Sequence, residues 1–88
     1  MTPRPGAGDF RDASPLTAAP TNAPLRVVAI EGGRGFHHRL IGMGLNVGSV
    51  LTVMHGAGGG GGPTLIAVGD TRLAIGHGMA ERILVAKV

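Results

Sequence analysis

Histidines are the residues of this chain best suited to chemistry, and there are four of them: His37, His38, His55 and His77. Imidazole binds divalent transition metals such as iron and zinc. His37 and His38 are adjacent in a predicted helix, where neighbouring side chains point about 100° apart, so one backbone does not readily aim both at one ion. We therefore expect solvated surface histidines, no required cofactor and no tight structural metal site. The alternative is a weak or intersubunit site for a divalent metal, Fe or Zn.

The acidic residues and the glycines form no pattern that is typical of an enzyme. Beyond the first 24 residues the only carboxylates are Glu31, Asp70 and Glu81, and turn or solvent-exposed positions account for all three. No Gly-x-Ser-x-Gly or His-Glu-x-x-His segment occurs, and the absence of cysteine excludes a thiol nucleophile. A phosphate-binding loop would need a lysine beside its glycines, and the only lysine is Lys87. We expect that the protein is not an enzyme.

The net charge of +3 and the pI of about 11.2 invite a test for nucleic-acid binding. The eight Lys and Arg residues are scattered and never adjacent, and only Phe10 and Phe36 could stack on bases. We expect no direct contact with nucleic acid. The sequence also has no apolar run approaching the ~18 residues of a membrane span and no apolar core of a signal peptide, so a cytoplasmic location is expected.

Five short strands and one short helix are predicted to position these residues. The predicted elements are strands at residues 25–30, 49–55, 64–68, 71–75 and 83–88, a helix at 36–43 and a helical turn at 76–81. Strands at this spacing, without long helical crossovers, are typical of small antiparallel sheets. The predicted fold class is all-β with short helices, forming a small SH3-like antiparallel barrel.

The connection between the helix and the second strand is the most informative local feature. Gly44 follows the helix at a position that needs a positive φ, which glycine adopts without a steric penalty. Gly48 comes just before the strand, and we predict that both glycines make structural turns. Within the helix, Phe36, Leu40 and Met43 recur at i, i+4 and i+7 and form one apolar face.

The first 24 residues differ in composition from the rest of the chain. Five of the six prolines lie there, and after Met1 only Phe10 and Leu16 are sizeable apolar residues. Such a segment buries too little apolar surface to offset the entropy lost on ordering it. We therefore predict a disordered Pro-rich tail at residues 1–24 and a single folded domain at residues 25–88.

Two of the predicted strands carry apolar residues on both of their faces. These are the runs Val50-Leu51-Thr52-Val53-Met54 and Leu65-Ile66-Ala67-Val68. A small barrel has one interior, so some of these side chains must face outward, and contiguous exposed apolar surface usually marks a binding partner. The alternative is that the helix and the last strand cover the outer face.

Several short motifs occur in a characteristic order along the predicted domain. They are residues 40–48, Gly62-Pro63, Ala67-Val68-Gly69-Asp70, Leu73-Ala74-Ile75, Met79-Ala80 and Ile83-Leu84-Val85. In this order and spacing they resemble the FeoA family, ferrous iron transport protein A. The resemblance covers residues 25–88, and Leu40, Gly44 and Gly48 match the helix–turn motif of that family.

The resemblance implies an SH3-like barrel in the bacterial cytoplasm and a partner, the FeoB-type membrane ferrous iron transporter, whose cytosolic portion is a GTPase. We therefore expect an accessory or regulatory protein of ferrous iron uptake that docks on this portion. The predicted contact residues are Phe36, Leu40, Ile41, Met43 and Leu45, with burial in the core as the alternative for Leu40.

A second functional hypothesis stays open beside the first. A domain related to this family is found at the C-terminus of some iron- and manganese-dependent repressors. The resemblance therefore also allows a metal-sensing or adaptor domain that binds a divalent transition metal. Assembly into a homo-oligomer is open under both hypotheses.

Overall fold

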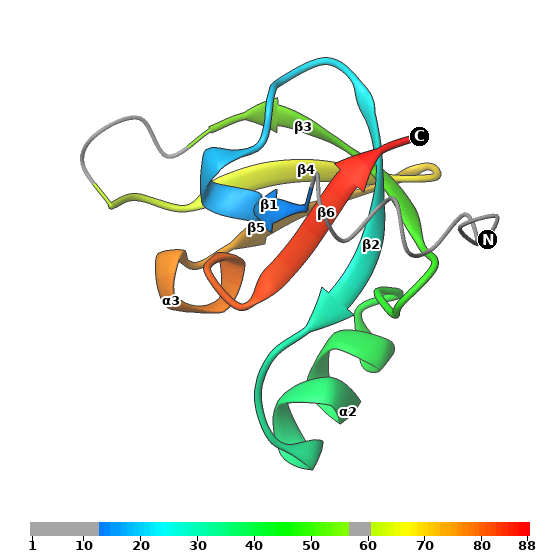
Figure 1. Cartoon of the computed structure of the whole chain (residues 1–88), viewed down its shortest axis with the longest axis vertical. Helices are drawn as coiled ribbons and strands as arrows, with labels where there is room; N and C mark the ends of the chain where they lie inside the picture. Colours follow the sequence, from blue (N-terminus) through cyan, green and yellow to red (C-terminus); the bar gives the residue numbers. More distant parts are fainter. Residues whose placement is uncertain (1–12, 57–60) are drawn as a thin grey trace, which may run out of the picture.

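The computed structural model describes residues 13–56 and 61–88, which form one six-stranded antiparallel sheet with short helical segments (Figure 1). The strands lie side by side in the order β1-β6-β2-β3-β4-β5. In chain order the strands are β1 (Ser14–Pro15), β2 (Pro24–Ile30), β3 (Val50–His55), β4 (Thr64–Val68), β5 (Thr71–Ile75) and β6 (Ile83–Lys87). The helical segments are the 3-10 turn η1 (Leu16–Ala18) and the helices α2 (Arg34–Gly42) and α3 (His77–Ala80).

The predicted class, all-β with short helices, is confirmed, and every predicted element is found within two residues of its expected bounds. Strand β1 is an addition to the predicted set. The sheet is curved (Figure 1). Its two edge strands, β1 and β5, do not pair with each other in the part of the chain that is described. Hydrogen bonding therefore does not close the barrel. Within the same residues, no helix has the length and apolar character needed to cross a membrane.

The N-terminal boundary of the domain needs a correction. Strand β1 pairs with β6, and the side chain that follows it, Leu16, is only 1% exposed. Further along, the backbone N–H of Asn22 donates to the carbonyl of Val53 at 2.8 Å. The fold therefore includes residues 13–24, and the prediction of a disordered tail is wrong for them. The physical reason is that burial of Leu16 stabilises a segment whose average composition indicates disorder. The rest of the predicted tail, residues 1–12, lies outside the described residues.

Apolar side chains from strands β2 to β6 and from all three helical segments meet in one core. Along β3, Leu51 and Val53 point inward, whereas Val50 is 44% exposed, and on β4 Leu65 is 36% exposed. The prediction that some apolar strand residues face outward is thereby confirmed. The buried core residues are Leu16, Leu25, Val27, Ile30, Leu40, Leu45, Leu51, Val53, Ile66, Ile75, Ala80, Ile83 and Val85.

Helix α2 ends in a turn that explains the pattern of glycines after it. The N–H of Gly44 donates to the carbonyl of Ile41 at 3.0 Å, and the N–H of Leu45 donates to that of Leu40 at 2.8 Å. This pair of bonds is a Schellman motif, in which the residue after the helix takes a left-handed conformation. Gly44 has φ of +90° and Gly48 has φ of +96°, so both predicted structural turns are confirmed.

Thr64 is the one buried polar residue among those described, and it gives a prediction about stability. Its side chain is 0% exposed, and its hydroxyl has no hydrogen-bond partner in the described part of the chain. Valine has nearly the same shape as threonine, with a methyl group in place of the hydroxyl. Thr64→Val is therefore expected to raise the free energy of unfolding by about 1 kcal/mol. Urea unfolding followed by circular dichroism measures this. Thr71→Val, at an exposed position of β5, serves as the control, and a destabilised Thr64→Val variant would contradict the prediction.

Candidate partner-binding surface

Helix α2, which was predicted to bind a partner, projects from one end of the sheet (Figure 1). Ile41 is 51% exposed at its end, and Phe36 and Met43 are half-buried. Leu40 and Leu45 are 0% and 1% exposed, so they belong to the core. For these two residues the predicted surface is wrong, because the Schellman turn directs both side chains beneath the helix end. The buried alternative for Leu40 is the correct one.

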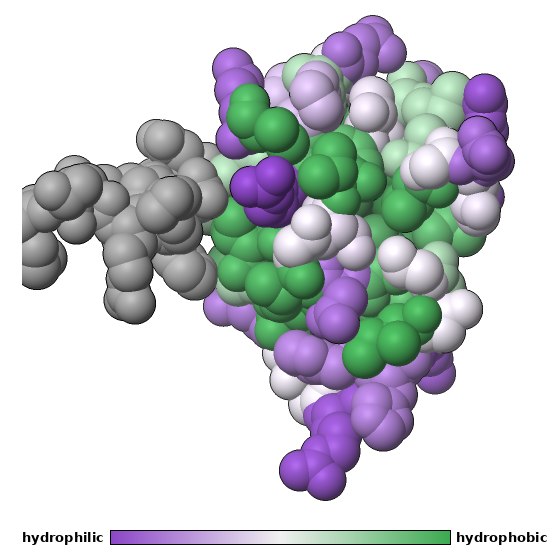
Figure 2. All heavy atoms as spheres, turned by 90° about the vertical axis from the view of Figure 1, so that its right-hand side faces the viewer, coloured by the Kyte–Doolittle hydropathy of each residue, from purple (hydrophilic) through white to green (hydrophobic). Residues whose placement is uncertain are grey.

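Exposed apolar side chains mark the connection from α2 to β3. Ile41, Val47 and Val50 are 51%, 54% and 44% exposed, and we call these three residues the connection surface. The chain between them is compact, since the N–H of Ser49 donates to the carbonyl of Asn46 at 3.0 Å. Figure 2 shows one face of the molecule, on which apolar side chains lie in several separate patches among polar ones. Exposed apolar side chains such as Ile41, Val47 and Val50 are suited to contact with another protein.

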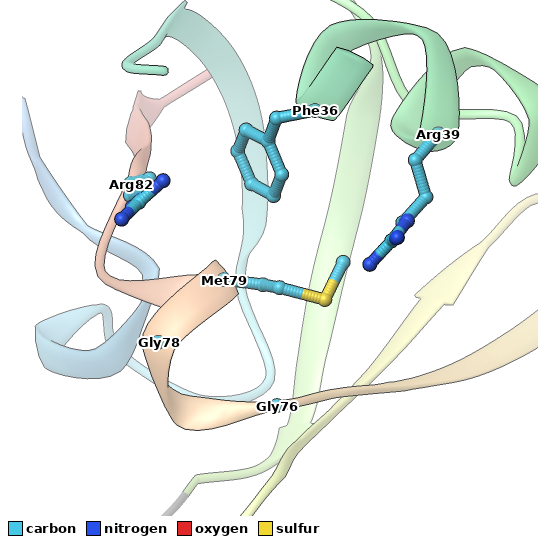
Figure 3. A pocket seen from close by; sticks show the side chains of 6 residues that line it. All are labelled: Phe36, Arg39, Gly76, Gly78, Met79 and Arg82. Carbon is cyan, nitrogen blue, oxygen red and sulfur yellow. The ribbon is translucent and has the colours of Figure 1, made fainter. Parts of the chain in front are cut away.

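A second feature is a pocket of about 370 Å³ between α2 and α3, which we call the α2–α3 pocket (Figure 3). The Phe36 ring and the Met79 side chain form its apolar part, and the guanidinium groups of Arg39 and Arg82 lie on opposite sides of them. The remaining lining residues are two glycines of the α3 turn, Gly76 and Gly78.

Local backbone geometry holds the Phe36 ring in this pocket. Gly32 has φ of +136°, and a Cβ atom on it would lie 2.9 Å from Cδ2 of Phe36. Glycine at this position therefore allows the ring to fold back against the chain. The guanidinium carbon of Arg82 lies 5.8 Å from the ring centroid, within the range of a cation–π contact. Phe36 is among the contact residues predicted from the sequence, whereas Arg39, Met79 and Arg82 are not.

Two of the four predicted metal candidates lie together near the start of α2. His37 and His38 line an open pocket of about 550 Å³, together with Gly32 and Arg34. Adjacent positions on a helix thus reach one pocket, contrary to the prediction that their side chains diverge. The guanidinium of Arg34 carries a positive charge in the same pocket, and that charge opposes the binding of a cation.

The other two histidines are apart from this pair. His77 Nε2 lies 2.8 Å from Glu81 Oε1, one turn further along α3, and both side chains are largely exposed. His55 is exposed at the end of β3. Across residues 13–56 and 61–88, no three His, Asp or Glu side chains are grouped so that they could hold a metal ion.

Comparison with known proteins places this geometry in a family. The model of the FeoA domain matches residues 14–87. A protein of Methanocaldococcus jannaschii, provisionally named Fe(2+) transport protein A, is 37% identical over 71 residues, which is 81% of this chain and 83% of the relative. A crystal structure described as an iron uptake regulatory protein (FeoA) has a TM-score of 0.74 and 36% identity, covering 86% of this chain and 97% of the other.

A more distant neighbour shares the fold alone. A manganese-dependent transcriptional repressor has a TM-score of 0.76 at 19% identity, covering 86% of this chain and 42% of the repressor. The architecture is thus that of a small SH3-like β domain, as predicted from the sequence. By its family match and its closely similar relatives, the chain belongs to the FeoA domain family. The match begins at Ser14, where β1 begins.

Proposed function

We propose that this protein is a cytoplasmic accessory protein of ferrous iron uptake that docks on the cytosolic GTPase part of a FeoB-type membrane transporter. Membership of the FeoA family carries the proposal, and two similar proteins are named for iron transport or iron uptake. In this role the protein acts through contact with its partner and requires no metal ion of its own.

The connection surface supports docking because it is apolar, exposed and carried by a hydrogen-bonded turn. Ile41 lies directly beside Leu40, whose burial anchors the helix end. The two hydrogen bonds that the N–H groups of Gly44 and Leu45 donate in the Schellman motif restrict the backbone on the other side of Ile41. A side chain presented by an ordered segment loses less entropy on binding than one presented by a mobile segment. We therefore place Ile41 at the centre of the contact.

Replacing Ile41 by glutamate is expected to weaken binding to the transporter's cytosolic part by about tenfold or more, because it places a charge in an apolar contact. The side chain is 51% exposed, so the domain should fold normally. Titration calorimetry with the recombinant cytosolic part, with and without guanine nucleotide, measures the affinity. Restoration of ferrous iron uptake in a deletion strain provides the second readout.

A matched control is Leu65→Glu, the same change at a 36% exposed residue of β4 outside the connection surface. This variant should bind as the wild type does. An Ile41→Glu variant that folds normally and still restores uptake would show that the contact lies elsewhere. A wild-type chain that binds the cytosolic part under no nucleotide condition would refute transporter docking itself.

A further inference from the structure

The α2–α3 pocket combines an apolar interior with two cations, a combination that the connection surface does not have. We infer that this pocket receives an apolar side chain flanked by a carboxylate, carried by a segment of the transporter's cytosolic part. The inference rests on the proposed function and adds the chemistry of the contact. It also adds a second point of attachment, separate from Ile41, at the other side of α2.

The apolar half of the pocket comes from two half-buried side chains. Phe36 and Met79 are both packed partly against the core, and they leave one side of each facing the pocket. Gly76 and Gly78 form the open wall of the pocket, where an added Cβ atom would meet nothing within 4 Å. The volume of about 370 Å³ lies at the low end of ligand pockets, which span roughly 300–1,000 Å³. It therefore suits one side chain better than a large ligand.

The charged half of the pocket selects for an anion. Arg39 approaches it from α2 and Arg82 from the turn between α3 and β6, and no acidic residue lines it. Within residues 13–56 and 61–88 no carboxylate lies within ion-pair distance of either arginine. Guanidinium groups bind carboxylates through paired hydrogen bonds. A carboxylate next to an apolar side chain would satisfy both halves of the pocket at once.

Two pocket variants test this inference on the full chain. Gly78→Leu adds a side chain to the open wall, and Arg39→Glu combined with Arg82→Glu reverses the charge. We expect each variant to weaken binding of the recombinant cytosolic part by about tenfold or more in calorimetry. Wild-type binding should also weaken as NaCl is raised, and the charge-reversed variant should lose this dependence.

The matched control is Gly35→Leu, which is also in a helix and also faces open space, but does not line the pocket. It should bind as the wild type does, and circular dichroism should show that all variants are folded. Unchanged binding by both pocket variants would overturn this inference and leave the proposed function standing. Weakening by charge reversal but not by Gly78→Leu would indicate a general electrostatic attraction and would also overturn it. A wild type that fails to bind would remove the proposed function and this occupant together.

Discussion

Replacing Leu40 by alanine is expected to lower the free energy of unfolding by about 2–5 kcal/mol. Leu40 is 0% exposed and is the one buried residue of α2, so the helix is attached to the core chiefly through it. Domains of this kind have a total stability of only about 5–15 kcal/mol, so the loss is a large fraction of the whole. Urea unfolding followed by circular dichroism measures the change.

The neighbouring residue supplies the control for this prediction. Ile41→Ala removes side-chain carbons of a similar kind at a 51% exposed position, and its stability should stay within about 0.5 kcal/mol of the wild type. The two variants separate folding from binding. Leu40→Ala removes a buried contact of the helix end, whereas Ile41→Ala shortens an exposed side chain of the connection surface. Equal stability of Leu40→Ala and the wild type would show that α2 is held by other contacts.

Leu16→Ala is expected to have an effect of similar size, a loss of about 2–5 kcal/mol. The residue is 1% exposed and lies in the short turn η1, between β1 and the chain leading into β2. It supplies the large apolar side chain by which residues 13–24 enter the core. Its replacement by alanine should therefore weaken the packing of this segment against the core and expose neighbouring core side chains to solvent. Thermal unfolding and hydrogen exchange of the amides of β6 measure both effects.

The control for Leu16→Ala is Ala18→Ser, a substitution at an exposed position in the same turn. This change should leave the melting temperature unaltered, since it removes no buried surface. Full stability in the Leu16→Ala variant would show that the Leu16 side chain does not anchor residues 13–24 to the core.

The transition from α2 to β3 could be predicted from the sequence because the residue types themselves restrict the backbone. Gly44 and Gly48 occupy positions with φ of +90° and +96°, where a Cβ atom is costly. The strands were predictable for a related reason, since short runs of β-branched and apolar residues bounded by glycine or proline favour extended chain. Both signals depend on neighbouring residues in the chain.

Leu16 was missed because its importance comes from a distant partner. The segment around it has the prolines and small residues of a disordered tail, and local composition does not show that β1 pairs with β6 at the other end of the chain. A proline in a strand is also an unusual signal, and Pro15 is accommodated because β1 is the end strand of the sheet.

Local backbone preferences and short-range periodicity are sufficient to predict the class of fold, strands β2 to β6, the helix α2 and the glycine turns. Which apolar residues of the helix segment are exposed depends on the packing of the whole chain. That packing buries Leu40 and Leu45 and exposes Ile41, since burial depends on what packs over a residue. It also brings Phe36 and Arg39 to Met79 and Arg82. Residues so far apart in the chain meet only when the sheet places α2 and α3 at the same pocket.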